Sequence, residues 1–121
     1  MVNILIIDDS PTEVYKLTTI LEKHQYSVDV ASNGEEGLRT AQVKRPDLIL
    51  MDVVMPGVNG FQATRQLSRN AVTKDIPVII VSTKDQDTDK VWGMRQGARA
   101  YLVKPVSENQ LLKAVADALI D

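Results

Sequence analysis

The sequence contains no cysteine, which excludes disulfide bonds and any metal site built from thiolates. It also lacks an excess of positive charge, because 14 Lys and Arg face 16 Asp and Glu, for a formal net charge of −2. Nucleic-acid binding usually needs a basic surface, so we expect no such partner. No apolar run approaches the length of a membrane span, and residues 1–3 lack the basic start of a signal peptide. These absences predict a cytoplasmic protein without membrane insertion.

The chain has 121 residues, of which 44% are hydrophobic and 25% charged. This size and balance are typical of one folded domain with one core. We find no internal repeat, low-complexity segment or linker. We therefore expect a single domain over residues 1–121, with no output domain attached.

Five short strand-like runs are spaced along the chain. One run, residues 28–30, alternates apolar and polar side chains, as a strand with one exposed face does. The other four are continuously apolar and predict strands buried on both faces. They are residues 4–7, 48–51, 78–81 and 101–103.

A helix signature follows each of these runs. In the first, Ser10 is the expected cap, Pro11 suits the first helical position and Glu13 completes a capping box. Alternating strands and helices predict an α/β fold, in which a parallel sheet carries helices on both faces. The strand order 2-1-3-4-5 fits best, because it places the alternating strand at an edge. The expected architecture is therefore flavodoxin-like.

Polar residues stand at the carboxyl ends of four predicted strands. They are Asp8 and Asp9, Asp52, Ser82, and Lys104. Ligand sites of such sheets lie at this edge, at the switch point between the first and third strands. Three clustered carboxylates repel one another, and a hard divalent cation such as Mg²⁺ offsets that repulsion. With a lysine and a hydroxyl added, the set has the parts for phosphoryl transfer to an aspartate, with Asp52 as the nucleophile.

Taken in order, these motifs resemble the receiver domain of two-component response regulators. They are the Asp-Asp pair, the lone Asp followed by a Met-Pro-Gly turn, the Ser after the fourth strand and the Lys-Pro after the fifth, and the resemblance covers the whole chain. It implies that Asp52 is the phosphoacceptor and that Asp9 binds Mg²⁺, or Mn²⁺ in its place, directly. Asp8 would act mainly through water, and the backbone carbonyl of Val54 would be a further metal ligand.

The resemblance also assigns roles at the last two strands. Lys104 would pair with the phosphoryl group, and the Lys104–Pro105 peptide would be cis. Ser82 and Tyr101 would form the switch pair, although the residues alone also fit a turn cap and a half-buried aromatic. Two positions depart from the usual pattern: Thr83 replaces a common Ala, and Val54 is apolar, so the lifetime of the phosphorylated state stays open.

Longer stretches resemble the PilH type of stand-alone regulator of type IV pilus twitching motility. They are residues 9–13, 60–67 and 83–93. This implies a chemotaxis-like sensor histidine kinase as phosphodonor. Phosphorylation would then remodel the face formed by the fourth helix, fifth strand and fifth helix, which an output protein of unknown identity would read.

Other functions are compared with this one. A phosphate sink, which drains a shared kinase and signals to nothing, stays open. A small aspartyl-phosphate phosphatase would need a carboxylate where Val54 stands, so we expect no enzyme. A flavodoxin-like cofactor carrier would bind phosphate at its first loop, where Asp8 and Asp9 would repel it.

Overall fold

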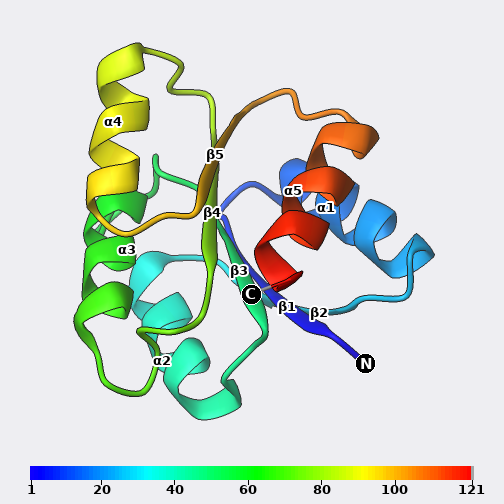
Figure 1. Ribbon diagram of the computed structural model, residues 1–121, viewed down its shortest axis with the longest axis horizontal. Helices are drawn as coiled ribbons and strands as arrows, with labels where there is room; N and C mark the ends of the chain where they lie inside the picture. The colour runs from blue at the N-terminus through cyan, green and yellow to red at the C-terminus, as the bar shows by residue number, and fades with distance from the viewer. Residues whose placement is uncertain (121) are drawn as a thin grey trace.

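The computed structural model describes residues 1–120 and contains a parallel sheet between two layers of helices (Figure 1). The five strands lie in the order β2-β1-β3-β4-β5, and all neighbours are parallel, which confirms the predicted topology. The alternating strand is at one edge, as expected. The strands are β1 (Asn3–Ile7), β2 (Ser27–Ala31), β3 (Leu48–Met51), β4 (Val78–Ser82) and β5 (Ala100–Val103).

Five helices connect or follow the strands. Figure 1 shows α1 and α5 on one face of the sheet and α2, α3 and α4 on the other. Polar caps begin several of them; Asn59, for example, forms a complete capping box with Gln62. Within residues 1–120, no helix combines the length and hydrophobicity needed to cross a membrane. The helices are α1 (Pro11–Lys23), α2 (Gly34–Lys44), α3 (Gly60–Arg69), α4 (Asp87–Arg95) and α5 (Glu108–Ile120).

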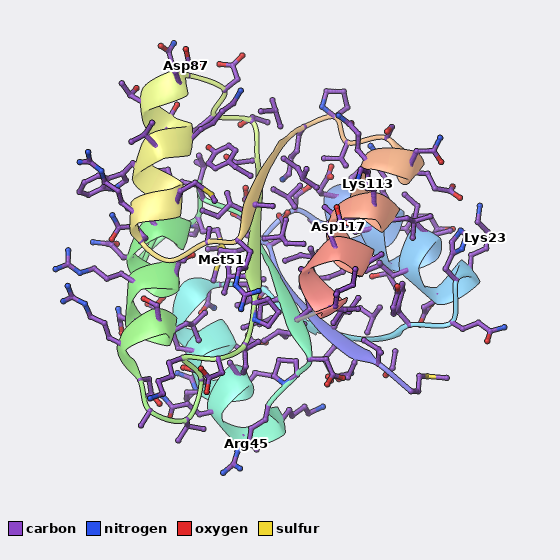
Figure 2. All side chains as sticks on the ribbon, in the orientation of Figure 1. Lys23, Arg45, Met51, Asp87, Lys113 and Asp117 are labelled. Atoms are coloured by element: carbon purple, nitrogen blue, oxygen red, sulfur yellow. The ribbon has the colours of Figure 1, made fainter. Side chains whose placement is uncertain are left out.

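The core has two main layers, because successive side chains of a strand point to opposite faces of the sheet. Ile4 and Ile6 of β1 pack with the cluster under α1 and α5, whereas Leu5 and Ile7 pack with the cluster under α2 and α3. Met51, in the interior in Figure 2, belongs to the second layer. All four of these β1 side chains are fully buried. The strands that end at the candidate site are thus held from both sides.

The prediction that the fifth strand is buried on both faces is wrong. All four residues of β5 are only partly buried. The reason is its position, since β5 is the second edge of the sheet and pairs with β4 alone. The helix beside it also covers little, because Gly93 is the only buried residue of α4.

The predicted capping box at the start of α1 is only half formed. The Glu13 N–H donates to Ser10 Oγ at 3.3 Å, as a cap requires. The reciprocal bond would run from the Ser10 N–H to the Glu13 carboxylate. Instead, the Ser10 N–H donates to Asp8 Oδ1 at 2.9 Å, and Glu13 Oε1 is buried without a hydrogen-bond partner.

Candidate functional site

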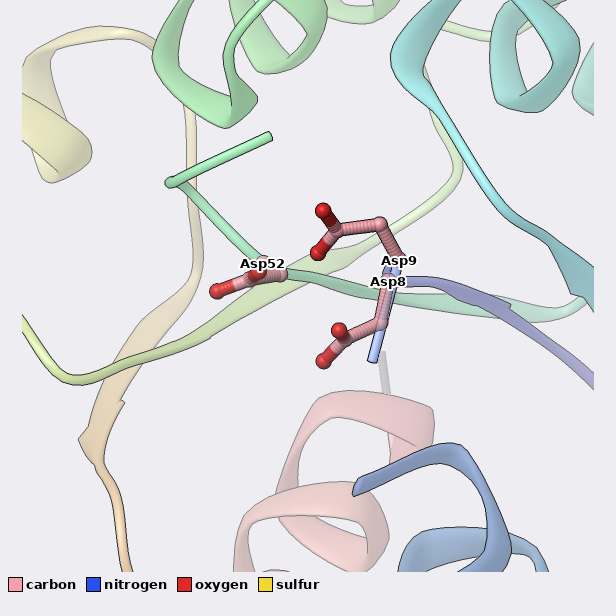
Figure 3. A group of neighbouring side chains, drawn as sticks. All are labelled: Asp8, Asp9 and Asp52. Atoms are coloured by element: carbon pink, nitrogen blue, oxygen red, sulfur yellow. The ribbon is translucent and has the colours of Figure 1, made fainter. Parts of the chain in front are cut away.

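Three aspartates meet where β1 and β3 end (Figure 3). The two strands are neighbours, and Ile7 pairs with Met51, so the residues that follow each strand lie side by side. Carboxylate oxygens of Asp8, Asp9 and Asp52 lie within 4.8 Å of one another. Asp8 and Asp52 are buried, whereas Asp9 is exposed. The structure thus brings together the three carboxylates that the sequence pattern singled out.

The position of Asp52 disfavours the charged form of its carboxyl group. Burial, followed by the negative charge of Asp8, raises its pKa from 3.8 to about 6, against the opposing influence of Lys104. A divalent cation would relieve this penalty. The donor set fits Mg²⁺, because it consists of carboxylate oxygens and because Asp9 is exposed, which would leave room for the water ligands that Mg²⁺ prefers. Asp8, Asp9 and Asp52 are therefore the described residues that would hold a metal.

Lys104 extends into the same cluster from the end of β5. Its Nζ lies 3.0 Å from Asp8 Oδ2 and 3.5 Å from Asp52 Oδ1, and its side chain is 12% exposed. Burial alone would lower its pKa, but the hydrogen bond to Asp8 and the nearby negative charges outweigh burial and raise it. The ammonium therefore stays charged at neutral pH. The peptide bond between Lys104 and Pro105 is cis, the conformer that the resemblance implied.

Ser82 and Tyr101, the predicted switch pair, both bond to the backbone of Lys84. The Lys84 N–H donates to Ser82 Oγ at 3.1 Å, and the Tyr101 hydroxyl donates to the Lys84 carbonyl at 2.8 Å. Ser82 is fully buried and Tyr101 half-buried. Burial raises the pKa of Tyr101, so its hydroxyl remains a donor. One residue of the β4–α4 loop thus links the two side chains.

Sequence reasoning missed this role of Lys84. A signal was present, because a serine side chain commonly accepts the N–H of the residue two positions later. The bond from Tyr101 had no local signal, since it spans 17 residues. Only the pairing of β4 with β5 brings these groups together.

Gly60 is a second residue whose role at the site needed the structure. In the sequence it appeared only within residues 60–67, one of the stretches that resemble PilH-type regulators. A Cβ atom at Gly60 would lie 2.0 Å from the Asp52 carbonyl oxygen, so no larger residue fits without moving the chain. This close approach packs α3 directly against the backbone of Asp52. In the loop between them, the Val54 side chain is exposed, and metal binding by its carbonyl stays a prediction.

Comparison with known proteins identifies relatives over nearly the whole chain. The family model described as "Response regulator receiver domain" matches residues 4–116. The protein PilH of Pseudomonas aeruginosa is 64% identical over 115 residues, which cover 95% of each chain. The family and subgroup resemblances drawn from the motifs are thereby confirmed.

Solved structures give the same result for the fold. The chemotaxis protein CheY4 of Vibrio cholerae superimposes with a TM-score of 0.92 at 32% identity, over 98% of this chain and 99% of that one. The receiver domain of a sensor histidine kinase from Pseudomonas aeruginosa has a TM-score of 0.91 at 25% identity, over 98% of both chains. The latter structure has a magnesium ion coordinated in its active-site cleft.

Proposed function

Because the chain belongs to the response regulator receiver domain family, we propose that it is a signalling switch phosphorylated on Asp52 with the help of Mg²⁺. The observation that carries this proposal is the convergence of three carboxylates and the Lys104 ammonium at the ends of β1, β3 and β5. This arrangement concentrates both signs of charge around one buried nucleophile.

In the proposed reaction, a carboxylate oxygen of Asp52 attacks the phosphorus of a phosphohistidine on the donor kinase. The new O–P bond forms as the P–N bond breaks, and the departing imidazole nitrogen keeps the electron pair. Mg²⁺ would supply positive charge next to the phosphoryl oxygens. Lys104 is placed to neutralise a further oxygen, since its Nζ already lies 3.5 Å from Asp52.

The response would then spread from Ser82. The Ser82 hydroxyl can donate to a phosphoryl oxygen while its Oγ accepts the Lys84 N–H, so a shift of Ser82 toward the phosphoryl group would pull on Lys84, whose carbonyl accepts the Tyr101 hydroxyl. The proposed result is a changed surface on α4, β5 and α5, which an output protein reads. Half-burial of β5 supports this, because partly buried elements move at a lower cost than core strands.

The proposed setting is type IV pilus or chemotaxis-like signalling in the cytoplasm. Its support is the 64% identity to PilH. A chemotaxis-like histidine kinase would be the donor. The alignment covers 95% of each chain, so the proposed setting draws on nearly the whole of PilH and not on one part of it.

The test is the intact mass of the protein after incubation with acetyl phosphate or with phosphoramidate, whose P–N bond resembles that of phosphohistidine. We expect a gain of one phosphoryl group in the presence of Mg²⁺ and none with a chelator. Asp52→Asn should abolish the gain with the fold intact by circular dichroism, whereas Asp117→Asn, an exposed residue on α5, should keep it. A phosphoryl group retained by folded Asp52→Asn, or absent from the wild type with both donors, would overturn the proposal.

A further inference from the structure

The Glu13 carboxylate is a partly buried charge that the proposed function leaves without a role. It lies in the first turn of α1, four residues after Asp9. Its Oε1 atom is buried and has no hydrogen-bond partner among the described residues. A buried carboxylate oxygen without a donor is costly, and such an atom in a folded protein calls for an explanation.

The local structure explains why Glu13 Oε1 has no hydrogen-bond partner. In a complete capping box its carboxylate would accept the Ser10 N–H, but Asp8 Oδ1 occupies that donor at 2.9 Å. The other oxygen of Asp8, Oδ2, binds Lys104 Nζ at 3.0 Å. Lys104 thus orients the Asp8 carboxylate, which accepts the Ser10 N–H. That N–H is then no longer available to the Glu13 carboxylate.

Lys104 has a hydrogen-bond donor that the Glu13 carboxylate could accept. An ammonium group carries three protons, and two of them face Asp8 Oδ2 and Asp52 Oδ1. The hydrogen bond to Asp8 and the charges of Asp52 and Asp8 are the main influences that raise the pKa of Lys104 against burial, and the negative charge of Glu13 adds a smaller one. Hydrogen bonds also connect the two residues, because the Glu13 N–H donates to Ser10 Oγ and the Ser10 N–H donates to the Asp8 carboxylate that binds Lys104. No direct bond joins Glu13 to the ammonium.

A bound cation would make the attraction between Glu13 and the Lys104 ammonium the main one that holds the ammonium in place. Asp8 and Asp52, the two partners of Lys104, are both members of the three-carboxylate group that would hold the ion. An ion there would neutralise them and repel the ammonium. Glu13 is not a member of that group, so its charge would remain available to Lys104.

We propose that Glu13 is a positioning residue, which keeps the Lys104 ammonium at the phosphorylation site by offering it an anion that the bound cation does not engage. The inference rests on the proposed function, because it concerns how Lys104 is kept ready for an incoming phosphoryl group. Glu13 itself touches neither the phosphoryl group nor the metal.

The direct test observes Lys104 without phosphorylation. In protein labelled with ¹⁵N and ¹³C on lysine, the ammonium signal of Lys104 is assigned with Lys104→Met and followed during titration with Mg²⁺. We expect the wild-type signal to persist at saturation, and the signal of Glu13→Gln to broaden or vanish as its ammonium is released to solvent. Glu22→Gln, which removes an exposed charge from the same helix, should behave as wild type. An ammonium equally persistent in Glu13→Gln would overturn the proposal.

A double-mutant cycle then tests whether Glu13 acts through Lys104. Phosphorylation by acetyl phosphate is measured in the wild type, Glu13→Gln, Lys104→Met and the double variant. Glu13→Gln should slow the reaction roughly fivefold when Lys104 is present, but by less than about twofold when it is absent. Equal effects in both backgrounds, or none in either, would refute a positioning role. A wild type that is not phosphorylated would refute the proposed function instead, while the Mg²⁺ titration would still decide the role of Glu13.

Discussion

The carboxyl ends of β1 and β3 differ sharply from the α4–β5 region in how they are held. Residues 4–7 of β1 are fully buried, and both strands have neighbours on each side. By contrast, β5 has one neighbour and only partly buried residues, and α4 buries only Gly93. Three large apolar side chains of α4 are exposed: Val91 by 53%, Trp92 by 48% and Met94 by 45%.

This difference fits the two tasks that we propose. The nucleophile and the metal-binding carboxylates must keep a fixed geometry, which closely packed strands provide. A surface that responds to phosphorylation must move at a small cost in free energy, and exposed elements with few buried contacts do so. The backbone of Lys84 joins the two regions, because it binds Ser82 on β4 and Tyr101 on β5.

The largest effect on the free energy of unfolding is expected when a large apolar side chain is truncated in the core and not on α4. Leu50→Ala removes a buried side chain of β3 and should lower the free energy of unfolding by about 3 kcal/mol. Met94→Ala, on exposed α4, should change it by less than about 0.5 kcal/mol. Urea unfolding of both variants gives the two values. Similar losses would show that α4 is packed as firmly as the core.

A second prediction concerns Asp52, at the end of β3, and how its ionisation changes the free energy of unfolding. The pKa of Asp52, about 6, is above its ordinary value of 3.8, so the folded protein binds more protons between these two pH values. The contribution of Asp52 to stability is therefore lost as the pH rises through about 6. With a chelator present, Asp52→Asn should be more stable than the wild type by about 2 kcal/mol at pH 7.

That gain should fall to about 0.5 kcal/mol near pH 4, where Asp52 is protonated in the folded protein and about half protonated in the unfolded one. Urea unfolding at pH 7 and pH 4 measures it, and Asp117→Asn on exposed α5 is the control, with no gain expected at either pH. A gain that does not depend on pH would contradict the electrostatic explanation.

The last prediction concerns the packing of the Tyr101 ring against α4. A Cβ atom added at Gly93 would lie 2.8 Å from Ile80 Cδ1 and 3.0 Å from the Tyr101 ring. Gly93→Ala should therefore displace the ring and break its bond to the Lys84 carbonyl, while stability changes by about 1 kcal/mol or less, since helix propensity offsets part of the strain. Near-ultraviolet circular dichroism reports the tyrosine environment. Thr88→Ala, at an exposed position of α4, should leave that spectrum unchanged.

Much of the fold followed from the sequence because the signals were local. The repeated strand–helix pattern and the alternating residues 28–30 were enough to predict the strand order. The same topology predicted that Asp8, Asp9 and Asp52 would meet, since the carboxyl ends of adjacent parallel strands share one edge. The burial of β5 was predicted wrongly, because an apolar run does not show how many neighbours its strand has.

The sequence by itself therefore determined the strand order and the acidic cluster, whose signals lie within single strands and their ends. Only the tertiary structure decided how the polar groups are paired. Lys104, 96 residues from Asp8, orients its carboxylate and so withdraws the Ser10 cap donor from Glu13. Tyr101 reaches the Lys84 carbonyl only because β5 pairs with β4. A hydrogen bond goes to whichever acceptor the folded chain brings closest, and residue order alone does not specify that competition.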